Sequence, residues 1–260
     1  MRLLNHQFSL SSELQVIAVL MLQIKMSELA TLKTEGDVSI ITLDDGKANV
    51  FSYPMLETLQ KILSEIPKDK GSVIITGRDG MFSGGFDLKT FASGDVDQIK
   101  NMSALGFKTL FDLYTFPRPV VAAISGHAVA LGIFVVCCCD YRIGIDGEFV
   151  VQANEVRNNM DIPVPIMEIA ASRVDKQHIY RALFHADPYK MSDAVSAGWI
   201  DEVVSSPEDL MTRAMEKAED LATLGHPMYQ KTKEVFQQDI VEKIQANLPN
   251  PSDSPSFVSV

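Results

Sequence analysis

Three short segments of the sequence combine residue types that could stabilise negative charge or move a proton. The first, Phe82-Ser-Gly-Gly-Phe-Asp-Leu88, follows an apolar run, and its paired glycines let the backbone approach a ligand closely. The second, Gly126-His-Ala-Val-Ala-Leu-Gly132, precedes a long apolar stretch. The third contains Glu155 among apolar residues, where burial would raise the pKa of its carboxyl group and allow proton transfer near neutral pH.

The first two segments share one chemistry, because both can present backbone N–H groups to an anion. The glycine pair at positions 84 and 85 frees such groups, and the first N–H groups of a helix have no intrahelical partner. Two such sources on two loops describe an oxyanion hole, for which a thioester enolate is a suitable ligand. Each segment also has a plainer interpretation: a tight turn for the glycines and a solvated loop acid for Glu155.

Other common site motifs are absent from these segments. The glycine-rich loop contains neither the G-x-G-x-x-G dinucleotide pattern nor a Gly-Lys-Ser/Thr phosphate loop. Ser83 is not flanked by the glycines of a nucleophile elbow.

Alternating strand-like and helix-like patterns must position these segments. Short β-branched or apolar runs predict strands at 38–43, 72–76, 119–124 and 141–145. Apolar residues at helical spacing predict helices at 55–66 and 99–114, and a helix buried on all sides at 128–139. Further helices are predicted at 166–174, 176–184, 192–197, 207–224 and 227–245, the fourth of them started by Ser206 and Pro207. This order predicts an α/β core followed by a helical carboxy-terminal region.

Composition limits the classes of partner. The chain has 260 residues, 46% of them hydrophobic and 22% charged, with a net charge of −11. An acidic balance argues against nucleic acid or an anionic membrane as the main partner. The run Cys137-Cys138-Cys139 has no spaced partners for a disulfide or a metal, so we interpret it as buried core in a reducing, cytoplasmic compartment.

The two ends of the chain differ from the rest. Residues 1–25 include an apolar run interrupted by Gln15 and Gln23, with no cleavage site after it and too few residues to span a bilayer. We interpret 1–25 as a non-functional extension, 26–190 as the core, 191–247 as a helical oligomerisation region and 248–260 as a flexible tail.

In order and spacing, these segments resemble the crotonase, or enoyl-CoA hydratase/isomerase, superfamily. Besides the two loops, Ala153-Asn-Glu-Val156 is similar to its catalytic-acid segment and Gly198-Trp-Ile-Asp-Glu-Val203 to a later block of the family. The resemblance covers about residues 28–245 and implies the crotonase (ClpP-like) fold, with repeated ββα units in a spiral and a carboxy-terminal helical region.

The resemblance also implies roles for individual residues. Glu155 would be the catalytic acid/base, the backbone N–H groups of Phe86 and Leu131 would bind the thioester oxygen, and Asp140 would be structural. Lys231 or Lys233 would approach the CoA phosphates, while His127 lies at a variable position of the family. The residues implied to line the acyl-CoA site are Gly85, Phe86, Asp87, Leu88, Lys89, Leu131 and Phe134.

One departure from the family pattern bears on the reaction. Hydratases of the family carry a first glutamate three residues beyond the second-loop oxyanion position, where this chain has Phe134. Because phenylalanine cannot orient water, we expect a shift of the double bond from 3-enoyl-CoA to 2-enoyl-CoA, which one acid can perform. The resemblance leaves open a hydratase, thioester hydrolysis, decarboxylation, or acyl-CoA binding without catalysis. Pro163-Val-Pro165 departs from the glycine-rich stretch that usually follows the acid, which leaves the acyl specificity open.

Family members assemble as trimers or dimers of trimers through their last helices, so the resemblance implies the same assembly here. Val235, Phe236 and Ile240 are the expected packing residues. No metal or redox cofactor is indicated, because CoA is part of the substrate.

Overall fold

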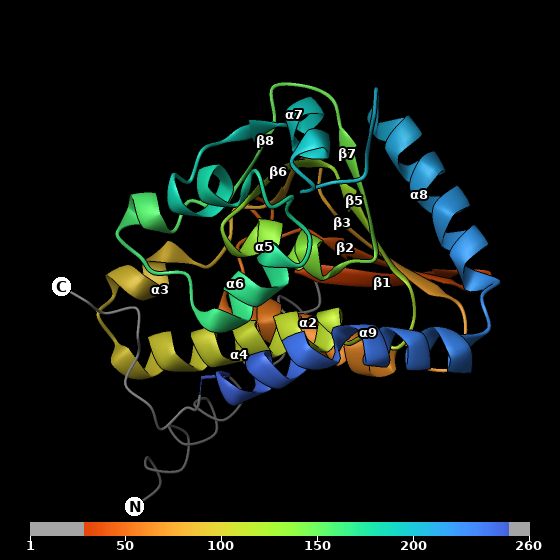
Figure 1. The fold of residues 1–260 in the computed structure, drawn as a ribbon, viewed down its shortest axis with the longest axis horizontal. Helices are drawn as coiled ribbons and strands as arrows, with labels where there is room; N and C mark the ends of the chain where they lie inside the picture. The colour runs from red at the N-terminus through yellow and green to blue at the C-terminus, as the bar shows by residue number, and fades with distance from the viewer. Residues whose placement is uncertain (1–28, 250–260) are drawn as a thin grey trace, which may run out of the picture.

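The computed structural model describes residues 29–249, which fold around two sheets (Figure 1). The main sheet has six strands in the order β1-β2-β3-β5-β7-β10, with β1 antiparallel to β2 and the other pairs parallel. Its strands are β1 (Ala30–Glu35), β2 (Val38–Leu43), β3 (Ser72–Gly77), β5 (Val120–Ile124), β7 (Tyr141–Ile145) and β10 (Glu202–Val204).

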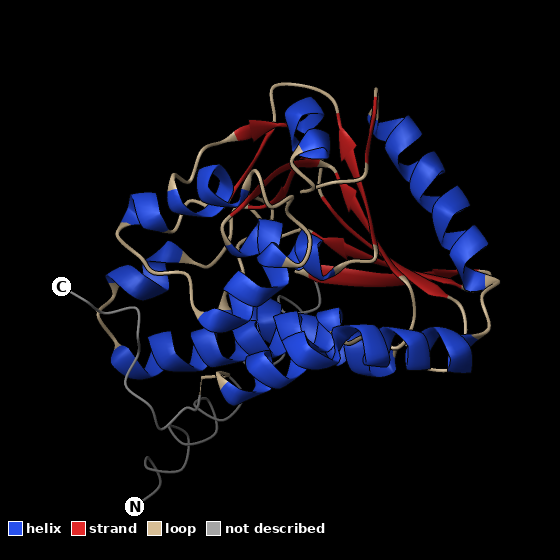
Figure 2. Cartoon of the chain, viewed as in Figure 1, coloured by secondary structure: helices blue, strands red, loops and turns tan. Residues whose placement is uncertain are grey.

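Apolar residues cover both faces of the main sheet, which is why its central strands read as unbroken apolar runs. On one face, residues such as Ile40, Ile74 and Val121 pack against helix α8 (Pro207–Ala222). On the other face, Ile41 and Ile75 join the larger core cluster beneath the remaining helices. Figure 2 shows the sheet between α8 and the main group of helices.

The second sheet is built from strands that follow those of the first. It contains β4 (Gly80–Ser83), β6 (Gly126–Val129), β8 (Val150–Gln152) and β9 (Tyr189–Lys190) in that order, with the first three parallel. Strands β4, β6 and β8 come directly after β3, β5 and β7, and a helix or helical turn follows each of them. This arrangement confirms the predicted repeated ββα units.

The remaining elements are mostly helices, and α8 begins at the predicted cap. The Oγ of Ser206 accepts from the N–H of Asp209 at the start of α8, as the sequence predicts. None of the helices within 29–249 has the length and apolar character needed to cross a membrane. The other elements are α2 (Tyr53–Glu65), α3 (Leu88–Ala92), α4 (Val96–Tyr114), α5 (Leu131–Cys138), the 3₁₀ turn η1 (Val156–Asn158), α6 (Val164–Ala171), the π-helix η2 (Tyr180–Phe184), α7 (Met191–Ser196) and α9 (His226–Ala246).

The helix predicted at 128–139 begins later than the sequence indicates. Ala128 and Val129 belong to strand β6 and pair with Val151 and Gln152 of β8. Ala130 then has φ 51° and ψ −129°, which a helix cannot accommodate, so α5 begins at Leu131. Hydrophobicity alone did not separate strand from helix here, because both are fully buried.

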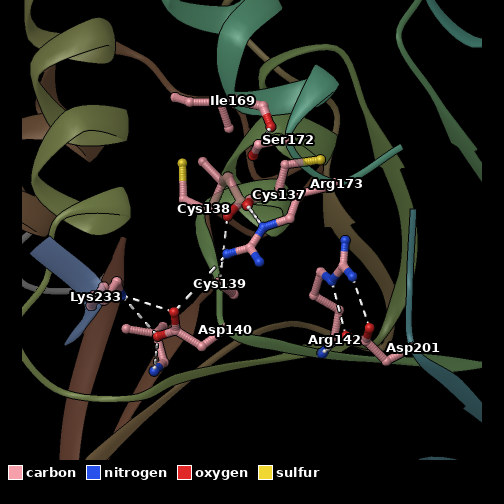
Figure 3. A network of polar contacts seen from close by, with 12 residues as sticks. Cys137, Cys138, Cys139, Asp140, Arg142, Ile169, Ser172, Arg173, Asp201 and Lys233 are labelled. Atoms are coloured by element: carbon pink, nitrogen blue, oxygen red, sulfur yellow. Dashed lines mark hydrogen bonds and ion pairs between the residues drawn. The ribbon is translucent and has the colours of Figure 1, made fainter. Parts of the chain in front are cut away.

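The segment 191–247, predicted as a helical region, also supplies a strand to the main sheet. Strand β10 pairs with β7, and the Arg142 guanidinium of β7 binds Asp201 just before β10, with Nη2 2.7 Å from Oδ1 and Nε 2.9 Å from Oδ2 (Figure 3). The predicted extension 1–25 lies outside the described residues, as do residues 250–260 of the predicted tail, whereas Leu248 packs against the main core.

Candidate active site

The three sequence segments follow the carboxyl ends of three neighbouring parallel strands. In the second sheet, Ser83 of β4 pairs with Ala128 of β6, and Ala128 pairs with Val151 of β8. Phe86 and Leu131 each come three residues after these paired positions, and Glu155 comes four residues after Val151. Ligands of parallel α/β sheets bind at this end of the strands, so the fold brings the three segments to one place.

The first loop is held by Asn49, a residue that the sequence analysis missed. Asn49 is fully buried, and its Nδ2 donates to the carbonyl oxygens of Leu43 (2.9 Å) and Met81 (3.0 Å). Its own carbonyl accepts from the Ser83 Oγ at 2.7 Å, and that Oγ accepts from the Gly85 N–H at 3.1 Å. Asn49 has φ 48°, and its position in a run of turn residues was the available signal, which did not reveal its contacts.

The first loop and the start of α5 approach too closely for larger residues. A Cβ added to Gly85, which has φ +92°, would lie 2.6 Å from the Ala130 Cβ and 3.1 Å from the Leu131 nitrogen. A Cβ added to Gly132 would lie 2.6 Å from the Ser83 oxygen. Glycine is therefore required at both positions, and the two loops lie in contact.

Each loop offers one backbone donor at this junction. Leu131 is the first residue of α5, so its N–H cannot bond within the helix. Within residues 29–249, neither this N–H nor that of Phe86 donates to a protein acceptor, although Phe51 N–H binds the neighbouring Gly85 carbonyl at 2.8 Å. The helix dipole of α5 adds partial positive charge at the Leu131 end.

Glu155 stands at the start of η1, directly beyond strand β8. It is 6% exposed, and it is the sole buried Asp or Glu of residues 29–249. Burial raises the pKa of its carboxyl group to about 7, a rise opposed by a hydrogen bond from its own backbone. Its Oε2 has no hydrogen-bond partner in the described part of the chain. Such a carboxyl group can hold or release a proton near neutral pH.

Apolar side chains surround the two donors. The Phe86 ring lies over Gly106 of α4, where an added Cβ would lie 2.5 Å from the ring and 3.6 Å from the Leu131 Cδ2. The same ring packs edge-on against Phe91, with centroids 5.9 Å apart. Phe134, expected to line the site, is fully buried on α5 and part of the main core.

The remaining residues of the first segment lie nearer the surface. The Asp87 carboxylate caps α3 by accepting from the Lys89 N–H at 3.1 Å, and both Leu88 and Lys89 are exposed. Beside them lies a groove of about 460 Å³, lined by Ser52, Tyr53, Pro54, Asp87, Thr90, Gln98 and Asn101.

Lys233 is not available for the CoA phosphates, contrary to one of the two expectations for that role. Its Nζ lies 2.8 Å from the Asp140 Oδ1, and the two side chains are 8% and 17% exposed (Figure 3). Asp140 also accepts from the Val120 N–H at 2.9 Å and lies 4.0 Å from the Arg173 Nη2. These contacts agree with a structural role for Asp140 and leave the exposed Lys231 as the other candidate.

The cysteines and His127 also have structural contacts. All three thiols are free and fully buried, and burial raises the pKa of the Cys137 thiol to about 11. The structure thus confirms the predicted core position of the cysteine run. The His127 Nδ1 accepts from the Val150 N–H at 3.2 Å, which links strands β6 and β8.

A second polar group beside Glu155 was also missed. The Oδ1 of Asn154 is buried and has no hydrogen-bond partner within residues 29–249. The residue type was visible in the sequence, but only the structure shows that its oxygen is without a donor.

Comparison with known proteins identifies relatives along most of the chain. The family model described as enoyl-CoA hydratase/isomerase matches residues 33–251. Enoyl-CoA delta isomerase 3 of Arabidopsis thaliana is 28% identical over 202 residues, which is 75% of this chain and 85% of that protein. A probable enoyl-CoA hydratase of Bacillus subtilis is 31% identical over 119 residues, which is 45% of this chain and 46% of that protein.

Solved structures agree with the architecture. An apo enoyl-CoA isomerase structure from Mycobacterium tuberculosis has a TM-score of 0.81 and 32% identity, covering 87% of this chain and 98% of that one. The structure of human mitochondrial delta3-delta2-enoyl-CoA isomerase has a TM-score of 0.78 and 22% identity, covering 84% of this chain and 86% of that one. At this identity the likeness is one of fold.

Proposed function

This chain belongs to the enoyl-CoA hydratase/isomerase family and is an acyl-CoA enzyme of the crotonase superfamily, and from that premise we propose that it isomerises 3-enoyl-CoA to 2-enoyl-CoA. Relatives described as isomerases and as hydratases both match the chain, so the choice between the two reactions depends on the site.

The proposed reaction needs one base and one oxyanion hole. The Glu155 carboxylate removes a proton from C2, and the electron pair moves into the thioester to form a dienolate. The N–H groups of Phe86 and Leu131 donate to the dienolate oxygen. Glu155 then returns the proton at C4, so that the double bond moves from C3–C4 to C2–C3 and no atom is gained or lost.

The observation that carries this proposal is the environment of Glu155. Its carboxyl group is buried, has a pKa near 7 and an oxygen without a partner, and follows the same sheet edge as the two free N–H groups. At the position of the first hydratase glutamate, Phe134 supplies no second acid. One carboxyl group that both accepts and donates a proton suits isomerisation better than hydration.

The test is Glu155→Gln, which preserves the shape of the side chain and removes the titrating group. We expect loss of 3-enoyl-CoA isomerisation by about a hundredfold or more, the range of general acid–base catalysis. Acyl-CoA binding, followed by calorimetry with a saturated acyl-CoA, should persist. Unchanged turnover by Glu155→Gln would contradict the mechanism. Loss of acyl-CoA binding together with turnover would indicate a misfolded site.

Asn154 supports hydration as a second candidate reaction. Its buried Oδ1 lacks a donor and adjoins Glu155 in the chain, so it could accept a hydrogen bond from a water molecule that Glu155 activates. Incubation with 2-enoyl-CoA in H₂¹⁸O distinguishes the reactions, because only hydration incorporates the label at C3. If hydration is faster than isomerisation, the second candidate replaces the first.

A further experiment addresses the other chemistries open to the superfamily. A panel of acyl-CoA substrates read by mass separates isomerisation, which leaves mass unchanged, from thioester hydrolysis and decarboxylation. Binding of these substrates with no product would indicate a non-catalytic acyl-CoA-binding protein.

We propose that the chain assembles as a trimer or a dimer of trimers through α9. Val235 and Phe236 are 75% and 81% exposed on this helix, as expected of residues that meet another subunit. Ile240, the third expected packing residue, instead packs partly buried against the chain's own core. Sedimentation equilibrium of the full chain tests the assembly, and a monomer would contradict it.

A further inference from the structure

One backbone carbonyl binds the chain on both sides of Glu155. The Ala186 oxygen accepts from the Gln152 Nε2 at 2.8 Å and from the Arg157 Nε at 2.8 Å. Gln152 ends strand β8 three residues before Glu155, and Arg157 lies two residues after it in η1. The carbonyl is thus a common anchor for the segment that carries the proposed base.

The anchor itself is firmly held. Ala186 is fully buried and has φ 52°, a left-handed conformation that alanine adopts only when its surroundings impose it. It lies just before strand β9, which pairs antiparallel with β8 through Val150 and Val151. The anchor therefore lies next to the sheet that sets the position of Glu155.

Arg157 makes a second contact from the same guanidinium. Its Nη2 lies 2.8 Å from the Asp187 Oδ1, while the Asp187 Oδ2 accepts from the Arg181 Nε at 3.2 Å. Arg157 therefore bridges two consecutive residues, Ala186 and Asp187. The Arg181 guanidinium also binds the Asp187 carboxylate and lies over the Tyr189 ring, 4.7 Å from its centroid, but it makes no contact with the Ala186 carbonyl. A planar guanidinium with two donors fixes direction as well as distance.

The turn around Glu155 is held from within by backbone bonds alone. The Glu155 carbonyl accepts from the Asn158 N–H at 2.9 Å and from the Met160 N–H at 3.0 Å, and the Asn154 and Val156 carbonyls accept from the N–H groups of Asn158 and Asn159 at 3.1 and 3.2 Å. The turn η1 is three residues long and is followed by Asn159 in the left-handed conformation, with φ 57°. A turn this short depends on contacts from outside to keep one geometry.

Arg157 acts on this turn through its contacts rather than through its charge on Glu155. The pKa of Glu155 is raised by burial and lowered by a hydrogen bond from its own backbone, and neither cause involves Arg157. Loss of Arg157 should therefore leave the pH at which Glu155 titrates near its present value.

We propose that Arg157 is a positioning residue, which fixes the turn bearing Glu155 by bridging Ala186 and Asp187 and thereby directs the carboxyl group toward the substrate. This inference rests on the proposed role of Glu155 as the base. A displacement of the order of 1 Å in a reacting group can reduce turnover about a hundredfold.

The test compares Arg157→Ala with Arg181→Ala as the matched control. Both variants remove an arginine that binds Asp187, with the same change in charge, but only Arg157→Ala removes a donor to the Ala186 carbonyl, which then keeps only the Gln152 Nε2 bond. We expect Arg157→Ala to lower kcat for isomerisation tenfold or more, with KM within about twofold and the pH midpoint unchanged. Arg181→Ala should retain kcat, and Arg157→Lys, which can form one of the two contacts, should recover part of the loss.

A second measurement is independent of activity. Hydrogen exchange of a peptide covering residues 153–162 reports the amides of Asn158 and Met160, which should exchange faster in Arg157→Ala and remain protected in Arg181→Ala. Equal kcat in the two alanine variants, or unchanged exchange in Arg157→Ala, would overturn the inference. If the unmodified protein turns over no 3-enoyl-CoA, the proposed function fails, whereas the exchange result still decides whether Arg157 holds the turn.

Discussion

At the scale of single residues, the burial of Glu155 ties the proposed chemistry to the stability of the chain. Water no longer solvates its carboxylate, so the folded state favours the protonated form and the pKa rises from 4.5 to about 7. When the pKa of a carboxyl group is higher in the folded state, the group makes its full contribution to the free energy of unfolding at pH values below its pKa in the unfolded chain. That contribution is lost as the pH rises through about 7, the pKa in the folded state.

Glu155→Gln should therefore stabilise the protein at alkaline pH, because glutamine does not ionise. Below about pH 4.5 the variant and the unmodified protein should unfold with similar free energies, since the carboxyl group is protonated in both states. The difference should grow through about pH 7 toward about 3 kcal/mol, which corresponds to the rise in pKa. Urea unfolding at pH 5, 7 and 9 measures it, and a pH-independent difference would contradict the burial.

At the scale of elements, the site depends on how closely β4 and α5 approach. Gly132 in the first turn of α5 faces the Ser83 carbonyl at the end of β4, and Gly85 faces Ala130, the residue between β6 and α5. These contacts involve main-chain atoms and the Ala130 Cβ, which cannot rotate away as the end of a flexible side chain could. The distance between the two loops is consequently set by residues without side chains.

Gly132→Ala should separate the two elements. The added Cβ would lie 2.6 Å from the Ser83 oxygen, so α5 must shift, and we expect a loss of about 1–3 kcal/mol in unfolding free energy. Because the Leu131 N–H moves with α5, kcat for isomerisation should fall as well.

The matched control for this change is Gly84→Ala in the same first loop. The atom nearest to a Cβ added at Gly84 is the Ala48 carbonyl oxygen at 3.4 Å, an ordinary contact. Its unfolding free energy should stay within about 1 kcal/mol of that of the unmodified protein. If the two variants are equally stable, the close approach of β4 and α5 does not limit the residue at position 132.

At the scale of the whole molecule, α9 is joined to the core by a largely buried ion pair near its middle as well as by apolar residues of its second half, Ile240, Val241 and Ile244. Lys233 binds Asp140, which follows the cysteine-rich helix α5, and Gln237 and Ile244 are the helix's buried residues beyond its first turn. Figure 3 shows Lys233 pointing toward Asp140, with Arg173 on the other side of the carboxylate. Removing one partner of a buried pair leaves the other charge poorly compensated.

Lys233→Ala should lower the free energy of unfolding by about 3 kcal/mol, the lower end of the range for breaking a buried pair. The control is Lys231→Ala, two residues away on the same helix and exposed, which should be neutral. Denaturant unfolding followed by circular dichroism measures both variants. Equal stability of the two would show that the Asp140 contact does not hold α9.

The sequence by itself determined the features that depend on local chemistry. The unbroken apolar strands, the Ser206 cap and the loop glycines each act within a few residues, so they predicted an α/β chain. They also placed Phe86 and Glu155 on loops and Leu131 in the first turn of a buried helix. The order of those loops carried the resemblance to the family. Boundaries were less certain, as Ala128 and Val129 show: their apolar character suits strand and helix equally.

Only the tertiary structure decided which of these residues meet and what surrounds them. Strands β4, β6 and β8 are three or four residues long, too short to show a period, and they align only because each is paired with its neighbours in space. Glu155 is buried by residues from other parts of the chain. The ion pair of Lys233 with Asp140 and the bond from Arg157 to Ala186 likewise join residues that are distant in sequence. Such contacts depend on how the whole chain packs, which no local pattern encodes.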